Sequence, residues 1–141
     1  MNLQDHITPD FAFRWIEDGQ ILQITTFDIS TEEKIKAYYD VMDDYIRNWL
    51  PEKTYLLLFD STQTSTENWT RYMRQRAEQA HALIPSTAKG LTSSVVKPGI
   101  LISFLRPFVE QQLNRKNPRV QTRLFYKYED ALNFLKGAMQ K

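Results

Sequence analysis

Apolar side chains change their spacing along this chain, and the change predicts an alternation of strands and helices. Aromatic residues alternate with other side chains over residues 10–16, which is the period of two of a strand with one buried face. An Asp18-Gly19 turn and a second β-favouring run at residues 21–27 follow. The two runs therefore predict a hairpin, preceded by a polar and flexible terminus at residues 1–9.

The spacing then changes to three and four, which predicts a helix from Ser30 to Trp49. Ser30 and Glu33 have the S-x-x-E spacing of a capping box, in which the hydroxyl and the carboxylate each accept from an orphan amide. Pro51 follows the last apolar position and ends the helix.

A continuous apolar run at residues 54–60 predicts a strand buried on both faces, the kind found inside a parallel sheet. Thr64 and Glu67 offer a second capping box, so a second helix is expected from there to Ile84, before Pro85. We expect this helix to be basic on its exposed side, where Arg71, Arg74 and Arg76 cluster.

The last third of the chain predicts a weaker strand at residues 89–96, a strand at 120–126 and a helix at 128–139. Residues 98–115 have helical spacing around Pro107, so this segment is either one kinked helix or two. The order β-β-α-β-α-β-α-β-α predicts one α/β domain over residues 10–141. Its sheet is mixed and mostly parallel, with an N-terminal antiparallel hairpin and covering helices.

Composition agrees with a single globular domain and excludes several kinds of chemistry. The 141 residues include no cysteine and two histidines, which removes disulfides and thiolate catalysis and leaves little for a metal site. No apolar run is long enough to span a membrane, and no signal-peptide pattern begins the chain. We expect a cytoplasmic protein without a cofactor or metal.

The net charge of +1 conceals an uneven distribution of charge along the chain. Residues 1–52 contain 11 acidic and 4 basic residues, whereas residues 53–141 contain 6 acidic and 14 basic ones. Two interpretations stay open. Both groups are solvated faces of one fold, or the chain associates with an acidic partner or with a second copy of itself.

Polar residues follow the central strand, where open α/β sheets usually place a site. Asp60 has two possible roles: it accepts hydrogen bonds from the next loop, or it takes part in catalysis or metal binding. The second role requires another carboxylate close by, and only Glu67 is near in sequence. No histidine is placed to activate Ser61, and we expect His81 to face solvent. The pattern favours a protein that is not an enzyme.

Several short motifs resemble the SpoIIAA-like branch of the STAS family, named after sulfate transporters and anti-sigma-factor antagonists. They are Trp15 before the Asp18-Gly19 turn, the hydrophobic strand that ends at Asp60, and Arg123-Leu124-Phe125 followed by residues 129–135, EDALNFL. Together they cover most of the chain. The resemblance implies a domain that binds a protein partner through the loop and helix after the central strand.

This surface corresponds here to Asp60, Ser61, Thr64, Ser65, Glu67, Asn68, Arg71 and Tyr72. In antagonists of anti-sigma factors a serine at the start of that helix is phosphorylated, which adds about −2 charge at the recognition surface. The corresponding positions here are Ser65 and Thr66. The family pattern reads Asp-Ser-Ser-Gly, whereas this chain reads Thr64-Ser65-Thr66-Glu67, without a glycine.

A second interpretation is a small-molecule or lipid carrier with an apolar pocket between helices and sheet, as in Sec14-like domains. The candidate lining residues are Trp15, Trp69, Phe104 and Phe108, although aromatic residues at such spacing are often simple core. Nucleic-acid binding is disfavoured because the arginines are scattered over three elements of a nearly neutral chain.

Overall fold

The computed structural model describes residues 4–49, 52–64, 70–85, 87–98, 106–116 and 119–139. Within these ranges six strands form one sheet in the order β1-β2-β3-β4-β5-β6. Their bounds are β1 His6–Ile7, β2 Phe11–Ile16, β3 Ile21–Thr26, β4 Tyr55–Asp60, β5 Gly90–Val95 and β6 Val120–Phe125.

The pairing of the strands confirms the predicted mixed sheet. β2 and β3 form an antiparallel hairpin, in which Ile16 is opposite Ile21, and β3, β4, β5 and β6 are parallel to one another. The hairpin loop has four residues instead of a two-residue Asp-Gly turn, and Glu17, Asp18 and Gly19 all have positive φ.

The N-terminal segment differs from the expected flexible terminus in its described part. His6 and Ile7 pair with β2 as the short edge strand β1. The Trp15 amide donates to the Asp5 carboxylate over 3.0 Å, and the Tyr45 hydroxyl donates to the Gln4 carbonyl. These partners lie far away in sequence, so the local polar composition could not reveal them.

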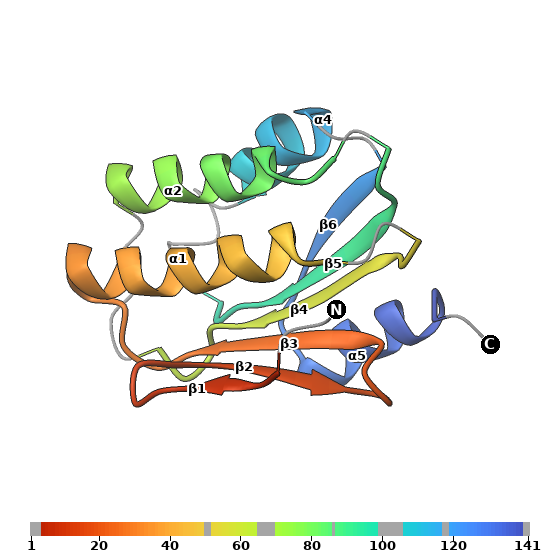
Figure 1. The fold of residues 1–141 in the computed structure, drawn as a ribbon, viewed down its shortest axis with the longest axis horizontal. Helices are drawn as coiled ribbons and strands as arrows, with labels where there is room; N and C mark the ends of the chain where they lie inside the picture. The colour runs from red at the N-terminus through yellow and green to blue at the C-terminus, as the bar shows by residue number, and fades with distance from the viewer. Residues whose placement is uncertain are drawn as a thin grey trace.

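Helices cover both faces of the sheet, but unequally (Figure 1). One face carries α1 (Glu32–Arg47), α2 (Arg71–Ala82), the π-helical segment η1 (Phe108–Leu113) and α4 (Asn114–Lys116), and α5 (Tyr128–Lys136) lies on the other. The parallel strands β3 to β6 are added in one direction, so crossovers of one hand place the connecting helices on the same face. The strand order does not reverse among these four strands.

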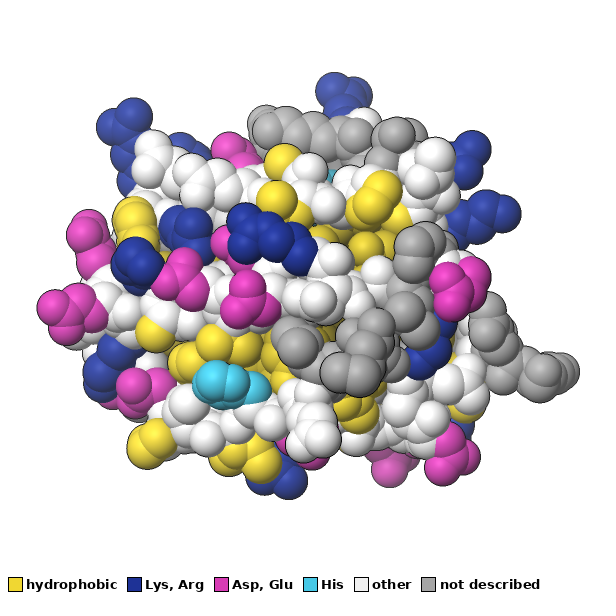
Figure 2. Space-filling model, in the orientation of Figure 1, with side chains coloured by type: hydrophobic (Ala, Val, Ile, Leu, Met, Phe, Trp, Pro, Cys, Tyr) yellow, Lys and Arg dark blue, Asp and Glu magenta, His cyan; other side chains and the backbone are white. Residues whose placement is uncertain are grey.

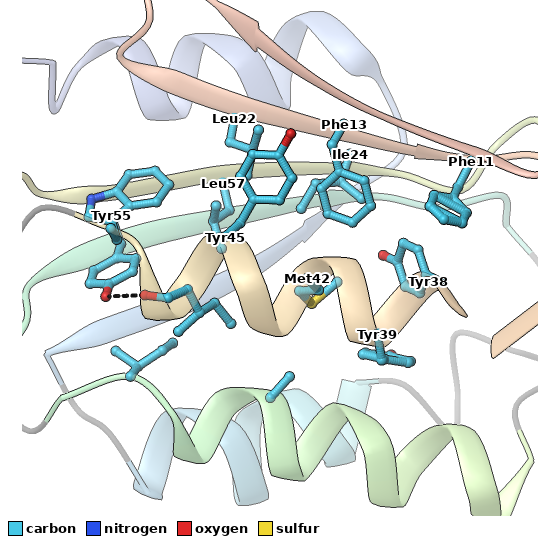
Figure 3. Packing of buried hydrophobic residues seen from close by; sticks show 14 of the residues in the cluster. Phe11, Phe13, Leu22, Ile24, Tyr38, Tyr39, Met42, Tyr45, Tyr55 and Leu57 are labelled. Carbon is cyan, nitrogen blue, oxygen red and sulfur yellow. Dashed lines mark hydrogen bonds between the residues drawn. The ribbon is translucent and has the colours of Figure 1, made fainter. Parts of the chain in front are cut away.

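The larger core lies between the sheet and α1 and is rich in stacked aromatic rings (Figure 3). Phe13 stacks on Tyr45 with ring centroids 5.0 Å apart, and Trp49 stacks on Tyr55 at 4.8 Å. Each such pair is worth about 0.5–1.5 kcal/mol beyond the area it buries. The smaller core lies under α5, where Ile21, Leu58 and Leu135 are fully buried.

Both predicted capping boxes are wrong. The N-cap of α1 is Thr31, whose hydroxyl accepts from the Lys34 amide at 3.2 Å, while the Ser30 hydroxyl donates to Asp28. The helix ends at Arg47, two residues before Trp49. The N-cap of α2 is Thr70, which accepts from the Met73 amide at 3.1 Å. Another hydroxyl of the same local chemistry caps each helix, one residue after the predicted cap in α1 and six residues after it in α2.

The segment around Pro107 is described only from residue 106. Arg106 and Pro107 are helical and continue directly into η1, and the fixed φ of Pro107 fits this conformation. The choice between one kinked helix and two falls on residues 99–105, which lie outside the described part.

Candidate functional site

The loop after β4 is held to its neighbours by its own polar side chains. Asp60 accepts from the Thr62 amide at 3.0 Å and from the Thr62 hydroxyl at 2.6 Å. The Ser61 amide and hydroxyl both donate to the Val95 carbonyl at 3.1 Å, which ties the loop to the end of β5. Asp60 therefore stabilises the local loop, as the simpler of its two interpretations proposed.

Thr64 lies inside the molecule instead of on its surface. It is 6% exposed, and its hydroxyl oxygen is 2.7 Å from the Thr26 hydroxyl and donates to the Thr26 carbonyl at 3.0 Å. Thr64 thus anchors the loop to the end of β3, and its side chain is not available to contact a partner directly.

The start of α2 presents Arg71 and Arg74 to solvent, while Tyr72 is half-buried against the larger core. Within the described ranges neither arginine takes part in an ion pair. The remaining residues expected at this surface, Ser65, Thr66, Glu67 and Asn68, lie outside the described part of the chain.

Arg76 differs from its two neighbours, and the expectation that it is exposed is wrong. Its side chain is 16% exposed and contacts Asp40 at 3.0 Å and Asp43 at 3.4 Å. It also lies over the Tyr39 ring. Because 3.6 residues complete a turn, Arg76 faces α1 while Arg71 and Arg74 face away. In Figure 2 basic and acidic side chains lie side by side over the junction of α1 and α2.

The ion pair between α1 and α2 lies in a poorly solvated environment. Burial raises the pKa of Asp43, and the Arg76 guanidinium opposes this shift. Within the described ranges Asp43 Oδ1 has no hydrogen-bond partner. The ion pair joins α1, which has a net negative charge, to α2, which has a net positive charge. Part of the uneven charge along the chain is therefore neutralised inside the fold.

A pocket of about 210 Å³ lies between the sheet, α1, α2 and η1. Its walls are mainly apolar side chains of the helices, such as Met42, Ile46 and Ala80, and Phe108 contributes from η1. His81 also lines it and is half-buried, so the expectation that it faces solvent is wrong.

The other aromatic residues expected to line a pocket are placed differently. Trp15 lies outside this pocket, with its ring against Tyr45 and Trp49 and under the Lys53 ammonium group. Trp69 and Phe104 lie outside the described residues. Among the four candidates, Phe108 is the one that the described lining includes.

The hydroxyl groups of the pocket were not among the site residues expected from the sequence. Thr92, Ser94 and Thr122 lie on the same face of β5 and β6, and they line the floor of the pocket. In the sequence, the polar residues of β5 only make the apolar pattern of a strand weaker. The spacing of two between Thr92 and Ser94 places them on one face of the strand, but which face of the sheet this is depends on the packing of the sheet.

Among the described residues, no three His, Cys, Asp or Glu side chains are grouped closely enough to hold a metal ion. No helix of that part has the length and apolar character needed to cross a bilayer.

Comparison with known proteins gives a similarity of fold. One similar solved structure is an anti-sigma factor antagonist from Mycobacterium paratuberculosis, with a TM-score of 0.55 and 11% sequence identity. The match covers 92% of this chain and 97% of that one. No family model matches this sequence, and no curated protein matches it either. The chain therefore has the α/β fold of an anti-sigma factor antagonist, in agreement with the resemblance seen in its motifs.

Proposed function

We propose that this chain is a non-enzymatic regulatory module that binds a protein partner. Its docking surface is formed by the end of β4, the following loop and the first turn of α2. By sequence position it includes Asp60, Ser61, Ser65, Glu67, Asn68, Arg71 and Tyr72, with Thr64 as the internal anchor of the loop. Support comes from the shared fold with an anti-sigma factor antagonist.

The observation that carries this proposal is the contrast among the three arginines of α2. Arg76 forms ion pairs with Asp40 and Asp43 within the fold, whereas Arg71 and Arg74 are exposed and have no ion pair among the described residues. They stand beside a loop that hydrogen bonds hold in place. A partner with acidic side chains would complement them, and such complementarity mainly increases the association rate and specificity.

Reversal of both charges tests the docking surface. Arg71→Glu/Arg74→Glu should weaken partner binding by at least about 10-fold, because like charges then face each other across the interface. The midpoint of thermal unfolding should change little, since both side chains are exposed. Binding is measured by quantitative pull-down and then by titration with the captured protein.

The matched control is Arg14→Glu/Lys136→Glu, which makes the same change in net charge at exposed positions of β2 and α5. It should leave binding unchanged. An equal loss of partner binding in both double variants would mean that the effect comes from net charge. Unchanged binding by Arg71→Glu/Arg74→Glu would mean that α2 is not part of the docking surface.

Phosphorylation of Ser65 or Thr66 is the form of regulation that this surface suggests. A phosphate adds about −2 charge, a few residues before Arg71. It would offset the basic character that the proposed partner recognises. The proposal that phosphorylation at these positions regulates binding therefore depends on the docking surface.

A second candidate function is that of a small-molecule carrier, and the pocket under α2 favours it. Its volume of about 210 Å³ is below the roughly 300–1,000 Å³ of pockets for drug-sized ligands. The candidate ligand is thus much smaller than a membrane lipid. Any molecule that binds the folded state here should raise the melting temperature.

A further inference from the structure

The floor of the pocket carries two buried threonine residues side by side. Thr92 of β5 and Thr122 of β6 are directly opposite in the parallel register, which places their backbones about 5 Å apart. They are 5% and 9% exposed, and both line the pocket. Thr92 is three residues from the end of β5, so it lies roughly 10 Å below the carboxyl edge of the sheet.

Neither of these hydroxyl groups has a hydrogen-bond partner among the described residues. The contacts of Thr122 are made by its amide and carbonyl, which bond to the Asn114 side chain. Most buried side-chain polar atoms in proteins are paired, and those that line a pocket are free to pair with whatever enters it. By contrast, the hydroxyls of Thr26, Thr64 and Ser93 are all bonded within the fold.

The rest of the lining determines what kind of group these hydroxyls can meet. Asp60 is the last residue of β4 and Lys97 follows the end of β5, so both lie at the carboxyl edge, away from the threonine pair. Tyr38 and Tyr39 remain neutral phenols because burial raises the pKa of both. Apart from His81 on α2, no other ionisable residue is part of the described lining. A charged ligand group at this depth would have no counter-ion beside the threonines, whereas a neutral donor or acceptor is satisfied by them.

The size of the pocket limits the ligand further. An apolar cavity of about 150 Å³ accommodates benzene, so about 210 Å³ holds a molecule with on the order of ten non-hydrogen atoms. Phe108 and Val109 reach the wall from η1, and π-helical turns are frequent at functional sites.

We infer that the pocket binds a small, neutral, largely apolar molecule whose single hydrogen-bonding group pairs with the Thr92 and Thr122 hydroxyls. A phenol or an alcohol of about ten non-hydrogen atoms has this chemistry. The inference rests on the carrier function and goes beyond it by naming the class of ligand and the two residues that select it. It does not depend on the docking surface at α2.

The test uses p-cresol and p-xylene, which have nearly the same shape and differ by a hydroxyl in place of a methyl group. Both are titrated calorimetrically into the full-length wild-type protein and into Thr92→Val/Thr122→Val. In the double variant the ratio of the p-cresol Kd to the p-xylene Kd should rise about 10-fold, because the phenol loses its hydrogen bonds to both threonine hydroxyls. The p-xylene affinity should stay the same or increase.

Thr25→Val is the matched control, because Thr25 is a buried threonine on the opposite face of the same sheet. It should leave the ratio unchanged. If the double variant does not fold, Thr92→Val and Thr122→Val alone should each raise the ratio about 3-fold.

The outcomes separate the inference from the carrier function. Binding of both probes with the same ratio in wild type and double variant overturns the role of the threonines and leaves the carrier function in place. Failure of both probes to bind at millimolar concentration overturns the inference and the carrier function together. A ratio that rises equally in Thr25→Val also contradicts the inference.

Discussion

Buried hydroxyl groups have separate roles in this protein, and their hydrogen bonds distinguish them. The Ser93 hydroxyl donates to the Ala131 carbonyl at 2.9 Å and so attaches α5 to the sheet. The Thr26 and Thr64 hydroxyls bond to each other and attach the loop after β4. Thr92 and Thr122 instead face the pocket. Residues of one chemical type thus hold a helix, hold a loop or face a pocket, according to where the packing places them.

Thr64→Val should destabilise the protein more than Thr26→Val. Without the Thr64 hydroxyl, both the Thr26 hydroxyl and the Thr26 carbonyl lose a partner, whereas Thr26→Val leaves the bond from Thr64 to that carbonyl intact. We expect a loss of about 1–3 kcal/mol for Thr64→Val, measured by urea unfolding. Equal effects of the two substitutions would contradict the role of Thr64 as the anchor of the loop.

At the scale of single elements, the start of α1 is held by a group of charges. Asp28 accepts from the Ser30 amide at 3.1 Å, from the Ser30 hydroxyl at 2.6 Å, and from the Lys34 ammonium group. Lys34 is also 3.6 Å from Asp10, just before β2. The hydrogen bond from Lys34, followed by those from Ser30, lowers the pKa of Asp28 from 3.8 to about 2. The beginning of α1 is thereby fixed against the beginning of β2.

The lowered pKa of Asp28 predicts an acid-dependent contribution to stability. A carboxyl whose pKa is lower in the folded state stabilises the fold above pH 3.8, and this contribution is lost between pH 3.8 and about 2. Asp28→Asn should therefore unfold more easily than wild type in urea at pH 5, and the difference should shrink by pH 2.5. A difference that stays constant with pH would show that the ionised carboxylate does not contribute.

The first residue of α4 forms hydrogen bonds with the outer edge of β6. The Asn114 side chain donates to the Thr122 carbonyl at 3.1 Å, and the Thr122 amide donates back to it at 2.8 Å. The amide group thus occupies the position of a neighbouring strand at the centre of this edge. An edge covered in this way is protected from pairing with another chain.

At the scale of the whole molecule, two cores share one sheet. Trp15 and Trp49 belong to the larger core on the α1 face, whereas Leu135 belongs to the smaller core under α5. The strands β3 and β4 contribute side chains to both, Leu22 and Leu57 to the first and Ile21 and Leu58 to the second. Because the same backbone supports both cores, we expect the chain to unfold as one cooperative unit.

Leu135→Ala tests this cooperativity. Leu135 is fully buried, so its truncation should cost about 2–5 kcal/mol. The fluorescence of Trp15 and Trp49, which belong to the opposite face and are measured in a Trp69→Phe background, should show the same lowered urea midpoint as far-UV circular dichroism. The control Lys136→Ala, at an exposed position of the same helix, should have little effect. Two separate transitions in Leu135→Ala would mean that the faces unfold independently.

The sequence by itself determined the order and type of the main strands and helices, but not the edge strand β1 or the π-helical form of η1. The period of two at residues 10–16, the period of three and four along α1 and the apolar run at β4 are local properties, and each produced the element that the structure contains. Turn and proline signals placed most boundaries within a few residues. These signals act between near neighbours in sequence, which is why they can be read without the fold.

The tertiary structure decided which residues meet, and therefore which of them can form a site. Thr31 was preferred to Ser30 as a cap, Arg76 turned toward Asp40 and Asp43, and Thr64 paired with Thr26 across 38 positions of sequence. The threonine pair of the pocket also arises only when β5 and β6 align in register. Such contacts depend on the alignment of strands and the packing of helices over them, and a one-residue shift of β5 or β6 would turn its threonine to the other face of the sheet.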